Sequence, residues 1–341
     1  MFRPSFLGDN SMSSPAATKP HKSYSELVSL LESRGMIIPD KQRAERKLSQ
    51  IGYYRLSGFW HPCRKIAKGS DGKGLKHFAT HRFIRRDQFQ DQTNIDEIIQ
   101  LYIFDKKLRL LMLDAIERIE IFIRTITAHE MGYHDPLAHQ NPQFINPKFQ
   151  KTWTGRNKGP RNLWNEWTIR QSELIQRSRE DCIQWYLTTQ KQIPIWVAVE
   201  AWDMGTLSKY FELLNGKYQR RICSRLGGPN EKELRNWLRE INTLRNRCAH
   251  HTRIWNQSVN SPLLVPKIPY FQRLNLTSRA RQRMFGMIAI LWFLVHQIGP
   301  SSHWLNQVAD LIDAKPAIAA CPNTSMGFSD NRGFPRALFG I

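Results

Sequence analysis

The strongest constraint on the fold is a long helical pattern between Asn94 and Met131. Apolar residues recur there at spacings of three and four, and Asp105 occupies one position of the series. The apolar positions are Ile98, Leu101, Leu108, Met112, Ala115, Ile119, Phe122 and Ile126. This spacing predicts a single helix with one apolar face, about 55 Å long if it is unbroken.

Shorter helices are predicted on both sides of this segment. Ser23 and Glu26 have the spacing of a capping box, and Asp40 precedes a second helix that runs to Ile51. Further helices are predicted at residues 166–188, 195–204, 205–214, 231–252, 278–298 and 305–312. The chain shows no convincing internal repeat and no alternation of strands with helices. We therefore expect an all-α protein, with a minor β element near residues 52–61 or 76–84.

Changes in composition divide the chain into four segments. Residues 1–22 are rich in Ser, Pro and Ala, which predicts a disordered arm. This arm lacks the apolar core of a secretory signal, and Met12 is an alternative start. A helical and aromatic region is expected at 23–90, followed by a helical domain at 91–315 with an excursion at 132–165. Residues 316–341 form a tail with little periodicity.

The charge balance indicates a polyanionic partner. Lys and Arg number 50 against 29 Asp and Glu, which gives a formal net charge of +21. Nucleic acid is the first candidate partner and an anionic membrane the second, against the alternative of a protein that is merely basic. The longest apolar run, Met284 to Val295, is too short to cross a bilayer, so no membrane span is expected. The five cysteines are scattered and form no CxxC pair, which favours a reducing cytosol and no structural zinc.

Most common catalytic motifs are absent. The glycine-rich run from Gly69 to Gly74 lies in a predicted solvated loop, residues 67–76, and lacks the ending of a phosphate loop. His129 and His134 are spaced one residue too far apart for a zincin motif, and no GxSxG elbow occurs. We therefore expect neither a metal site nor a cofactor.

One constellation remains near the end of the 231–252 helix, with the sequence LRNRCAHHT from Leu244 to Thr252. Asn246 and His250 are four residues apart and share a face. Arg245 and His250 are five apart and diverge by about 140° on an ideal helix. They converge only if the helix loosens or if two copies of it face each other. Histidine can transfer protons of a ribose 2′-OH or a leaving 5′ oxygen, and arginine can hold the phosphate. The alternative is a basic helix terminus that complements the helix dipole.

The motif resembles the Arg-polar-x3-His signature of the HEPN superfamily, and its surroundings resemble the Abi (abortive infection) proteins of that superfamily. Further blocks match in family order, starting at Lys19, Leu48, Leu101 and Pro194, and Met326-Gly-Phe matches a short C-terminal block. The resemblance covers roughly residues 19–330. It implies an all-α HEPN-type helical bundle with an N-terminal extension. It also implies a metal-independent endoribonuclease in phage defence that is often toxin-like and commonly a homodimer, with an antitoxin as a further candidate partner.

The resemblance also assigns residues. When the roles of the family motif are assigned to this sequence, Arg245 and His250 are the catalytic pair and Asn246 is the polar position between them. His251 is an additional candidate. Glu120 and Arg124 resemble supporting polar positions, against the alternative of an ordinary i, i+4 ion pair. Members regulated by a nucleotidyltransferase antitoxin often carry His-x-Tyr at this place. Thr252 stands at the tyrosine position here, so regulation through that tyrosine is not expected.

An aromatic cluster supplies a separate candidate for RNA binding. Tyr53 and Tyr54 can stack on bases and Arg55 can contact phosphate, although packing within the N-terminal region is the favoured alternative. The leading function hypothesis is an Abi/HEPN endoribonuclease that cuts RNA by 2′-OH attack. The second is a non-catalytic RNA-binding module that holds a structured small RNA, and the third is a helical scaffold for other defence proteins.

Overall fold

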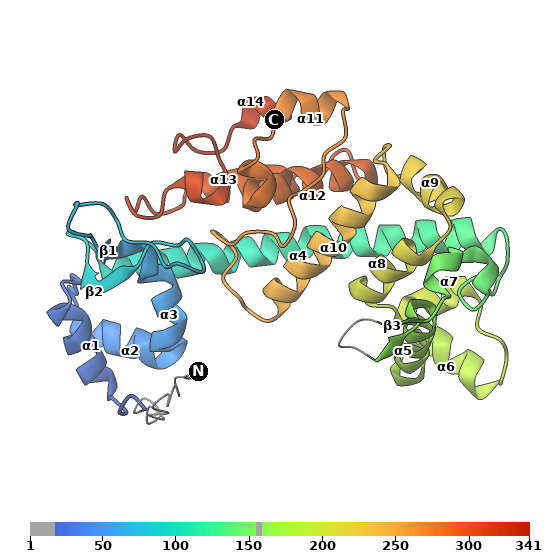
Figure 1. Ribbon diagram of the computed structural model, residues 1–341, viewed down its shortest axis with the longest axis horizontal. Coiled ribbons are helices and arrows are strands. Elements are labelled where there is room, and N and C mark those ends of the chain that lie inside the picture. The colour runs from blue at the N-terminus through green and yellow to red at the C-terminus, as the bar shows by residue number, and fades with distance from the viewer. Residues whose placement is uncertain (1–17, 155–158) are drawn as a thin grey trace, which may run out of the picture. The chain divides into compact units, whose positions relative to one another are not determined.

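A computed structural model describes residues 18–154 and 159–341 of the chain, so the first 17 residues of the arm predicted at 1–22 lie outside the described range. The structure is 58% helical, and the described residues contain two small two-stranded sheets. The prediction of a mainly α-helical protein is therefore confirmed. The chain forms two compact units, which divide between Ile98 and Ile99. Figure 1 labels their elements.

Three helices build most of the first unit: α1 (Tyr24–Ser33), α2 (Lys41–Ile51) and α3 (Tyr53–Trp60). The predicted caps are confirmed, because Ser23 and Glu26 form a capping box and Asp40 caps α2. The β element considered at 52–61 is wrong, since this segment is α3. Gly52 adopts a positive φ of 90°, which ends α2 and lets the chain restart as a helix.

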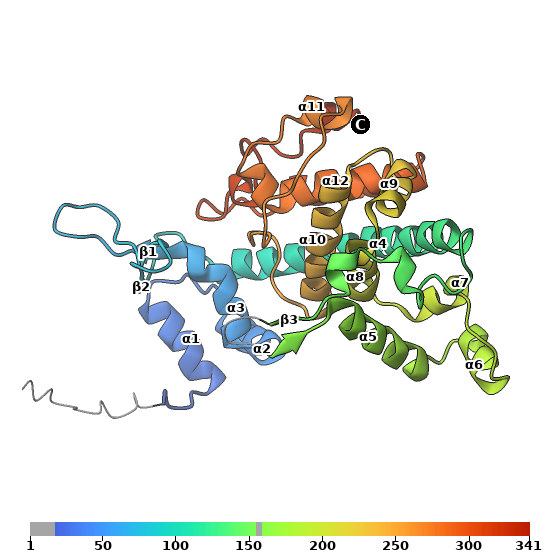
Figure 2. The same ribbon diagram turned by 45° about the vertical axis from the view of Figure 1, so that its right-hand side comes forward.

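A β-hairpin completes the first unit. After a 3₁₀ turn (His61–Cys63), β1 (Arg64–Ile66) pairs antiparallel with β2 (Arg85–Phe89). A bridge between Lys76 and Phe83 lies within the 76–84 segment, which confirms that alternative for the minor β element. The connection between β1 and β2 extends beyond the helices of this unit, as Figure 2 shows.

Helix α4 (Ile95–Gly132) confirms the long helical pattern. Its 38 residues correspond to about 57 Å of helix. Most apolar positions of the predicted series are fully buried, namely Ile98, Leu101, Leu108, Met112, Ala115 and Ile119. Asp105, which interrupts the series, is also fully buried.

The predicted excursion after α4 is largely irregular. It contains 3₁₀ turns at Pro142–Phe144 and Pro147–Phe149 and the two-residue strands β3 (Trp153–Thr154) and β4 (Pro160–Arg161). The single helix predicted at 166–188 is instead two helices, α5 (Leu163–Arg177) and α6 (Asp181–Thr188). The break between them lets Ile175 and Ile183 join one apolar cluster.

A ring cluster joins α5 to the following helices. The chain continues as α7 (Ile195–Ala198), a 3₁₀ turn (Val199–Ala201), α8 (Met204–Leu213) and α9 (Gly216–Ser224). Trp167 of α5 stacks on Tyr210 of α8 with ring centroids 4.8 Å apart. The Trp167 indole N–H donates to the carbonyl of Thr206, so α5 and α8 are held by both packing and a hydrogen bond.

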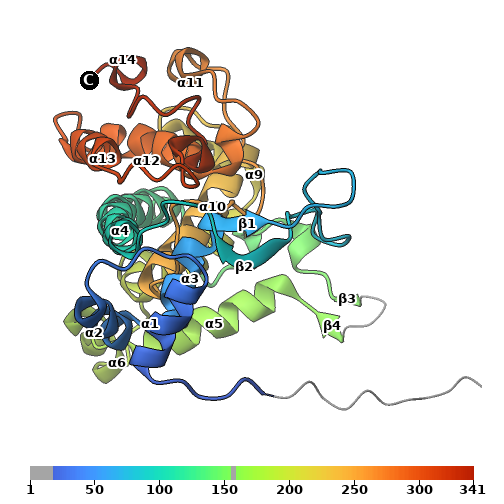
Figure 3. The same cartoon turned by 90° about the vertical axis from the view of Figure 1, so that its left-hand side faces the viewer.

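The core of the second unit centres on a helix that is apolar all round. The chain then forms α10 (Glu231–Ala249), the short α11 (Pro269–Leu274), α12 (Met284–Ile298) and α13 (Trp304–Asp313). Every residue of α12 from Met284 to Val295 is buried, and Figure 3 shows α12 and α13 alongside α4, which is seen end-on. The indole N–H of Trp304 donates to the carbonyl of Leu111 at 2.7 Å, which attaches α13 to α4.

The segment around α12 departs from the sequence prediction and is closely packed. The helix predicted at 278–298 begins only at Met284, after a 3₁₀ turn at Ala280–Gln282. A Cβ at Gly286 would lie 2.5 Å from the carbonyl oxygen of Ala280, so only glycine fits there. The segment at 316–341, which has little periodicity in the sequence, contains a 3₁₀ turn (Asn323–Met326) and α14 (Arg336–Phe339).

No helix within residues 18–154 and 159–341 is long and apolar enough to cross a membrane.

A candidate active site at the end of α10

The RNRCAHH motif occupies the last turns of α10 and its C-terminal cap. The helix ends at Ala249, and His250 is the C-cap residue. His251 follows with a φ of 57°, in the left-handed region. The N–H of Thr252 donates to the carbonyl of Arg247, and the N–H of His251 donates to that of Cys248. These two bonds form a Schellman ending, in which a histidine takes the place usually held by glycine.

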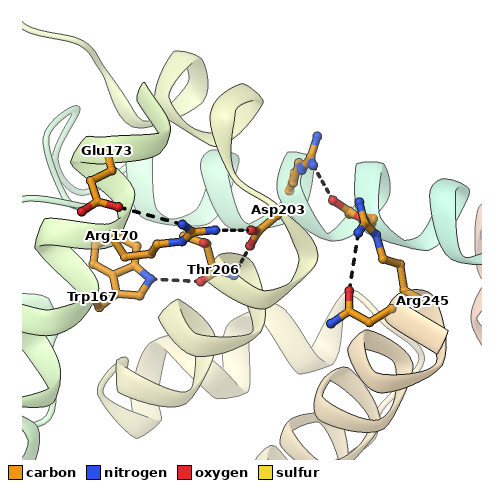
Figure 4. Close-up of polar contacts among 9 residues, drawn as sticks. Trp167, Arg170, Glu173, Asp203, Thr206 and Arg245 are labelled. Carbon is orange, nitrogen blue, oxygen red and sulfur yellow. Dashed lines mark hydrogen bonds and ion pairs between the residues drawn. The ribbon is translucent and has the colours of Figure 1, made fainter. Parts of the chain in front are cut away.

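The candidate catalytic side chains lie at the surface. Asn246 and His250 are exposed, and Arg245 is partly buried. The Arg245 guanidinium donates to the side-chain oxygen of Asn246 at 3.5 Å, a bond at the long limit that Figure 4 marks with a dashed line. Within the described residues, no hydrogen bond joins Arg245 to His250. Because α10 remains helical between them, the two side chains diverge as the sequence spacing predicts.

A buried carboxylate on α4 holds the chain just after the motif. Asp105 accepts hydrogen bonds from the backbone N–H groups of Ile254 at 2.9 Å and Trp255 at 2.8 Å. It also forms an ion pair with Arg109, one turn later in α4. Burial raises the pKa of Asp105, while these partners favour its ionised form. The polar residue in the apolar series of α4 therefore anchors the segment that follows His251.

Two residues of α10 hold the next part of the same segment. Glu240, which is 1% exposed, accepts hydrogen bonds from the N–H groups of Asn260 and Ser261. Arg247 donates to the carbonyl of Ser258 at 2.8 Å. The second arginine of the motif is thus committed to the local fold, whereas Arg245 remains at the surface.

The cysteine within the motif is a buried thiol. Cys248 is 2% exposed, and burial raises the pKa of its thiol to about 12. Because the thiolate is the reactive form, this side chain serves in the core. Arg245, Asn246, His250 and His251, in contrast, reach the surface at the end of α10.

The supporting residues Glu120 and Arg124 form an i, i+4 ion pair on α4. Both side chains are largely buried, at 12% and 19% exposure. Among the described residues, no hydrogen bond or ion pair connects this pair to Arg245, Asn246 or His250. The contacts therefore place Glu120 and Arg124 together without linking them to the motif.

A polar network around Asp203 was not singled out from the sequence. Asp203 caps α8 by accepting from the N–H of Thr206 at 2.7 Å, and it pairs with Arg170 of α5 at 3.0 Å (Figure 4). Although burial opposes ionisation, the bonds from Thr206 and Arg170 lower the pKa of Asp203. A Cβ at Gly205 would lie 3.5 Å from Asn242, so α8 begins close to α10 one turn before Arg245. The sequence feature that could have revealed this network is an Asp that stands three residues before a Thr at the start of a helix.

The aromatic candidates belong to the first unit. The Tyr53 hydroxyl accepts a hydrogen bond from Arg34, and its ring meets the fully buried Trp60 edge-on, with centroids 5.1 Å apart. Tyr54 is 74% exposed, and Arg55 is also exposed. Tyr53 is thus engaged in packing, and of the two tyrosines only Tyr54 presents most of its ring to solvent.

Within residues 18–154 and 159–341, no group of three or more His, Cys, Asp or Glu side chains is placed to hold a metal ion.

Comparison with known proteins supports an Abi family protein. The family described as Abi-like protein matches residues 46–256, more than half of the chain. The matched range includes Asp105, the Asp203 network and the whole of α10. No curated protein and no solved structure matches the chain. The chain therefore belongs to the Abi-like protein family.

Proposed function

We propose that this protein is a metal-independent endoribonuclease of the Abi/HEPN type that acts in phage defence. Membership of the Abi-like family suggests a function of the abortive-infection type. The observation that best supports an endoribonuclease activity is that Arg245, Asn246 and His250 contact solvent at the end of α10. The backbone that follows is held by N–H groups that donate to Asp105 and Glu240 and by a carbonyl that accepts from Arg247. Exposed polar groups on a fixed scaffold are what a catalytic site requires.

The chemistry is an attack of the ribose 2′-OH on the adjacent phosphate. His250 takes the proton of the 2′-OH while its oxygen bonds to phosphorus. The bond from phosphorus to the 5′ oxygen breaks, and water supplies the proton to the departing oxygen. Arg245 binds the non-bridging phosphate oxygens and stabilises the charge of the transition state. The products are a 2′,3′-cyclic phosphate and a 5′-OH end.

The proposal includes a homodimer. Arg245 and His250 of one copy point in different directions, so one α10 end does not place both on the same phosphate. Two α10 ends related by a two-fold axis supply His250 from one copy and Arg245 from the other. His250 is exposed and Arg245 is only partly buried in the single chain, which leaves both side chains accessible for such a pairing.

Cleavage of total cellular RNA in EDTA tests the activity. Wild type is expected to produce cyclic-phosphate ends, and Arg245→Ala and His250→Ala to lose cleavage. Arg239→Ala, an exposed arginine earlier in α10, is the matched control and is expected to cleave normally. Cleavage that survives in both motif variants contradicts the assignment.

The formal net charge of +21 supports the alternative function of a non-catalytic RNA-binding module. It is favoured if wild type binds RNA with a steep salt dependence and forms no product. Failure to bind RNA at moderate salt favours a scaffold.

A further inference from the structure

A second cationic feature lies far along the chain from α10, in the β-hairpin of the first unit. Residues 64–89, which we name the basic hairpin, contain eight Lys and Arg against two Asp. The connection between the strands is exposed from Ser70 to Ile84, apart from Gly74. The sequence alone predicted a solvated loop at 67–76 and, as one of two alternatives, a minor β element at 76–84.

The fold of the hairpin gives this loop a defined shape. The N–H of Leu75 bonds back to Ala67, and that of Ile84 bonds to Leu75, so three short extended segments lie side by side. A Cβ at Gly74 would lie 2.9 Å from the Phe83 ring and 3.0 Å from Ile66, so glycine is needed for this close packing. The last turn is closed by bonds from the His77 N–H to Arg82 and from the His81 N–H to His77.

The tip of the hairpin presents aromatic rings to solvent. Phe78 is 87% exposed, and its ring stacks on His77 with centroids 5.1 Å apart and planes at 21°. Phe83 is 46% exposed, and the Lys76 ammonium lies 5.2 Å from its centroid. An exposed phenylalanine at a fixed tip contributes nothing to a core, and its free face is open to another planar group.

The cations beside these rings are available for a ligand. Among the described residues, Arg82 and Arg86 have no ion pair and no side-chain hydrogen bond, and both are exposed. Arg82, Ile84 and Arg86 are two residues apart from one another along an extended segment, so all three lie on the same face. The two arginines are about 13 Å apart on that face. Free guanidinium groups beside an open aromatic stack match the backbone phosphates and bases of single-stranded nucleic acid.

We propose that the basic hairpin binds single-stranded RNA, with Phe78 stacking on a base and Lys76, Arg82 and Arg86 contacting phosphates. This inference rests on RNA being the ligand in the proposed function. It assigns the contact to the hairpin tip rather than to the tyrosines of α3. The site is separate in the chain from Arg245 and His250, so binding and cleavage can be measured independently.

The test is binding of the full chain to a labelled 2′-O-methyl single-stranded RNA, whose blocked 2′ oxygen prevents cleavage by the proposed attack. Phe78→Ala is expected to weaken binding about tenfold, as loss of one stacked base does. The triple variant Lys76→Gln, Arg82→Gln, Arg86→Gln is expected to reduce the slope of log K against log salt by about 2. Tyr54→Ala and the α2 double variant Lys41→Gln, Arg46→Gln are exposed controls, expected to change affinity by less than about twofold.

The outcomes separate the two proposals. If wild type binds RNA and the hairpin variants bind equally well with the same salt slope, the hairpin assignment is wrong while the nuclease proposal stands. If the variants lose binding to anionic phospholipid vesicles but not to RNA, the hairpin is a membrane contact and the assignment is also wrong. If wild type binds no RNA, the proposed function loses its substrate. Unchanged thermal unfolding by circular dichroism shows that the exposed substitutions leave the fold intact.

Discussion

The carboxylate of Asp105 accepts a 2.9 Å hydrogen bond from the backbone N–H of Ile254, four residues after His250. The same oxygen also accepts from Trp255, and the other oxygen faces Arg109. This single buried side chain connects the long helix α4 to the chain that leaves the candidate site. It is the contact on which we expect the geometry of that site to depend most.

Replacing Asp105 by Asn is expected to destabilise the protein by about 3 kcal/mol or more, because it leaves Arg109 buried without its partner. Asp114 forms an exposed i, i+4 ion pair with Arg118 on the same helix. Replacing Asp114 by Asn is expected to lower the free energy of unfolding by less than about 0.5 kcal/mol. Urea unfolding of both variants measures the difference. Equal effects would show that Asp105 is no more important to the fold than a surface ion pair.

Mixing two inactive variants tests the composite dimer. Arg245→Ala and His250→Ala are each expected to lose cleavage alone. A mixed dimer retains His250 from one copy and Arg245 from the other, which completes one of its two sites. Random pairing makes about half of the dimers mixed, so the mixture is expected to recover up to about a quarter of the wild-type activity. The mixture needs an unfolding and refolding step so that subunits exchange. A mixture as inactive as its components argues against a site shared between copies.

Substitutions of His251 distinguish the effect of its backbone conformation on stability from the contribution of its imidazole to cleavage. Its φ of 57° is tolerated best by glycine and worst by a β-branched residue. We expect the free energy of unfolding to be higher for His251→Gly than for His251→Val, by at least about 1 kcal/mol. Urea unfolding measures this difference, and cleavage by His251→Gly then reports on the loss of the imidazole. If the Val variant is as stable as the Gly variant, the backbone at His251 is not strained.

Protonation of His139 is expected to destabilise the fold in acid. This histidine is fully buried, and burial lowers its pKa from 6.5 to about 4, although Asp135 opposes the change. A pKa lowered by folding gives stability that is complete above about 6.5 and is lost as the pH falls toward 4. The loss amounts to about 3 kcal/mol, because lowering a pKa by one corresponds to about 1.4 kcal/mol.

The His139→Leu variant should lack this part of the pH dependence. Urea unfolding at about pH 7 and about pH 4.5 is expected to show a smaller difference in the variant than in wild type. The matched control is His129→Leu, which changes an exposed histidine of α4. If the His139 variant keeps the wild-type pH dependence, another group accounts for it.

Local patterns predicted the helices well where their signals were strong. The 3.6-residue period of α4 and the caps at Ser23 and Asp40 depend on residues a few positions apart, so they are visible in the chain alone. The segment 52–61 was ambiguous because its aromatic residues also suit strands. It forms α3 since Leu56, Phe59 and Trp60 are all buried at helical spacing. The break between α5 and α6 depends on the cluster that Ile175 and Ile183 share.

The sequence by itself determined the strongly periodic and capped helices and the places of the candidate site residues along α10, because helical periodicity, capping and the order of the Arg245 to His250 motif are local properties. Only the tertiary structure decided what holds that motif and what else the surface offers. The partner of Asp105 lies 149 residues away in the chain, and the exposed rings of the basic hairpin depend on packing around Gly74. Such contacts arise from the folded arrangement of distant segments, and no short-range pattern encodes them.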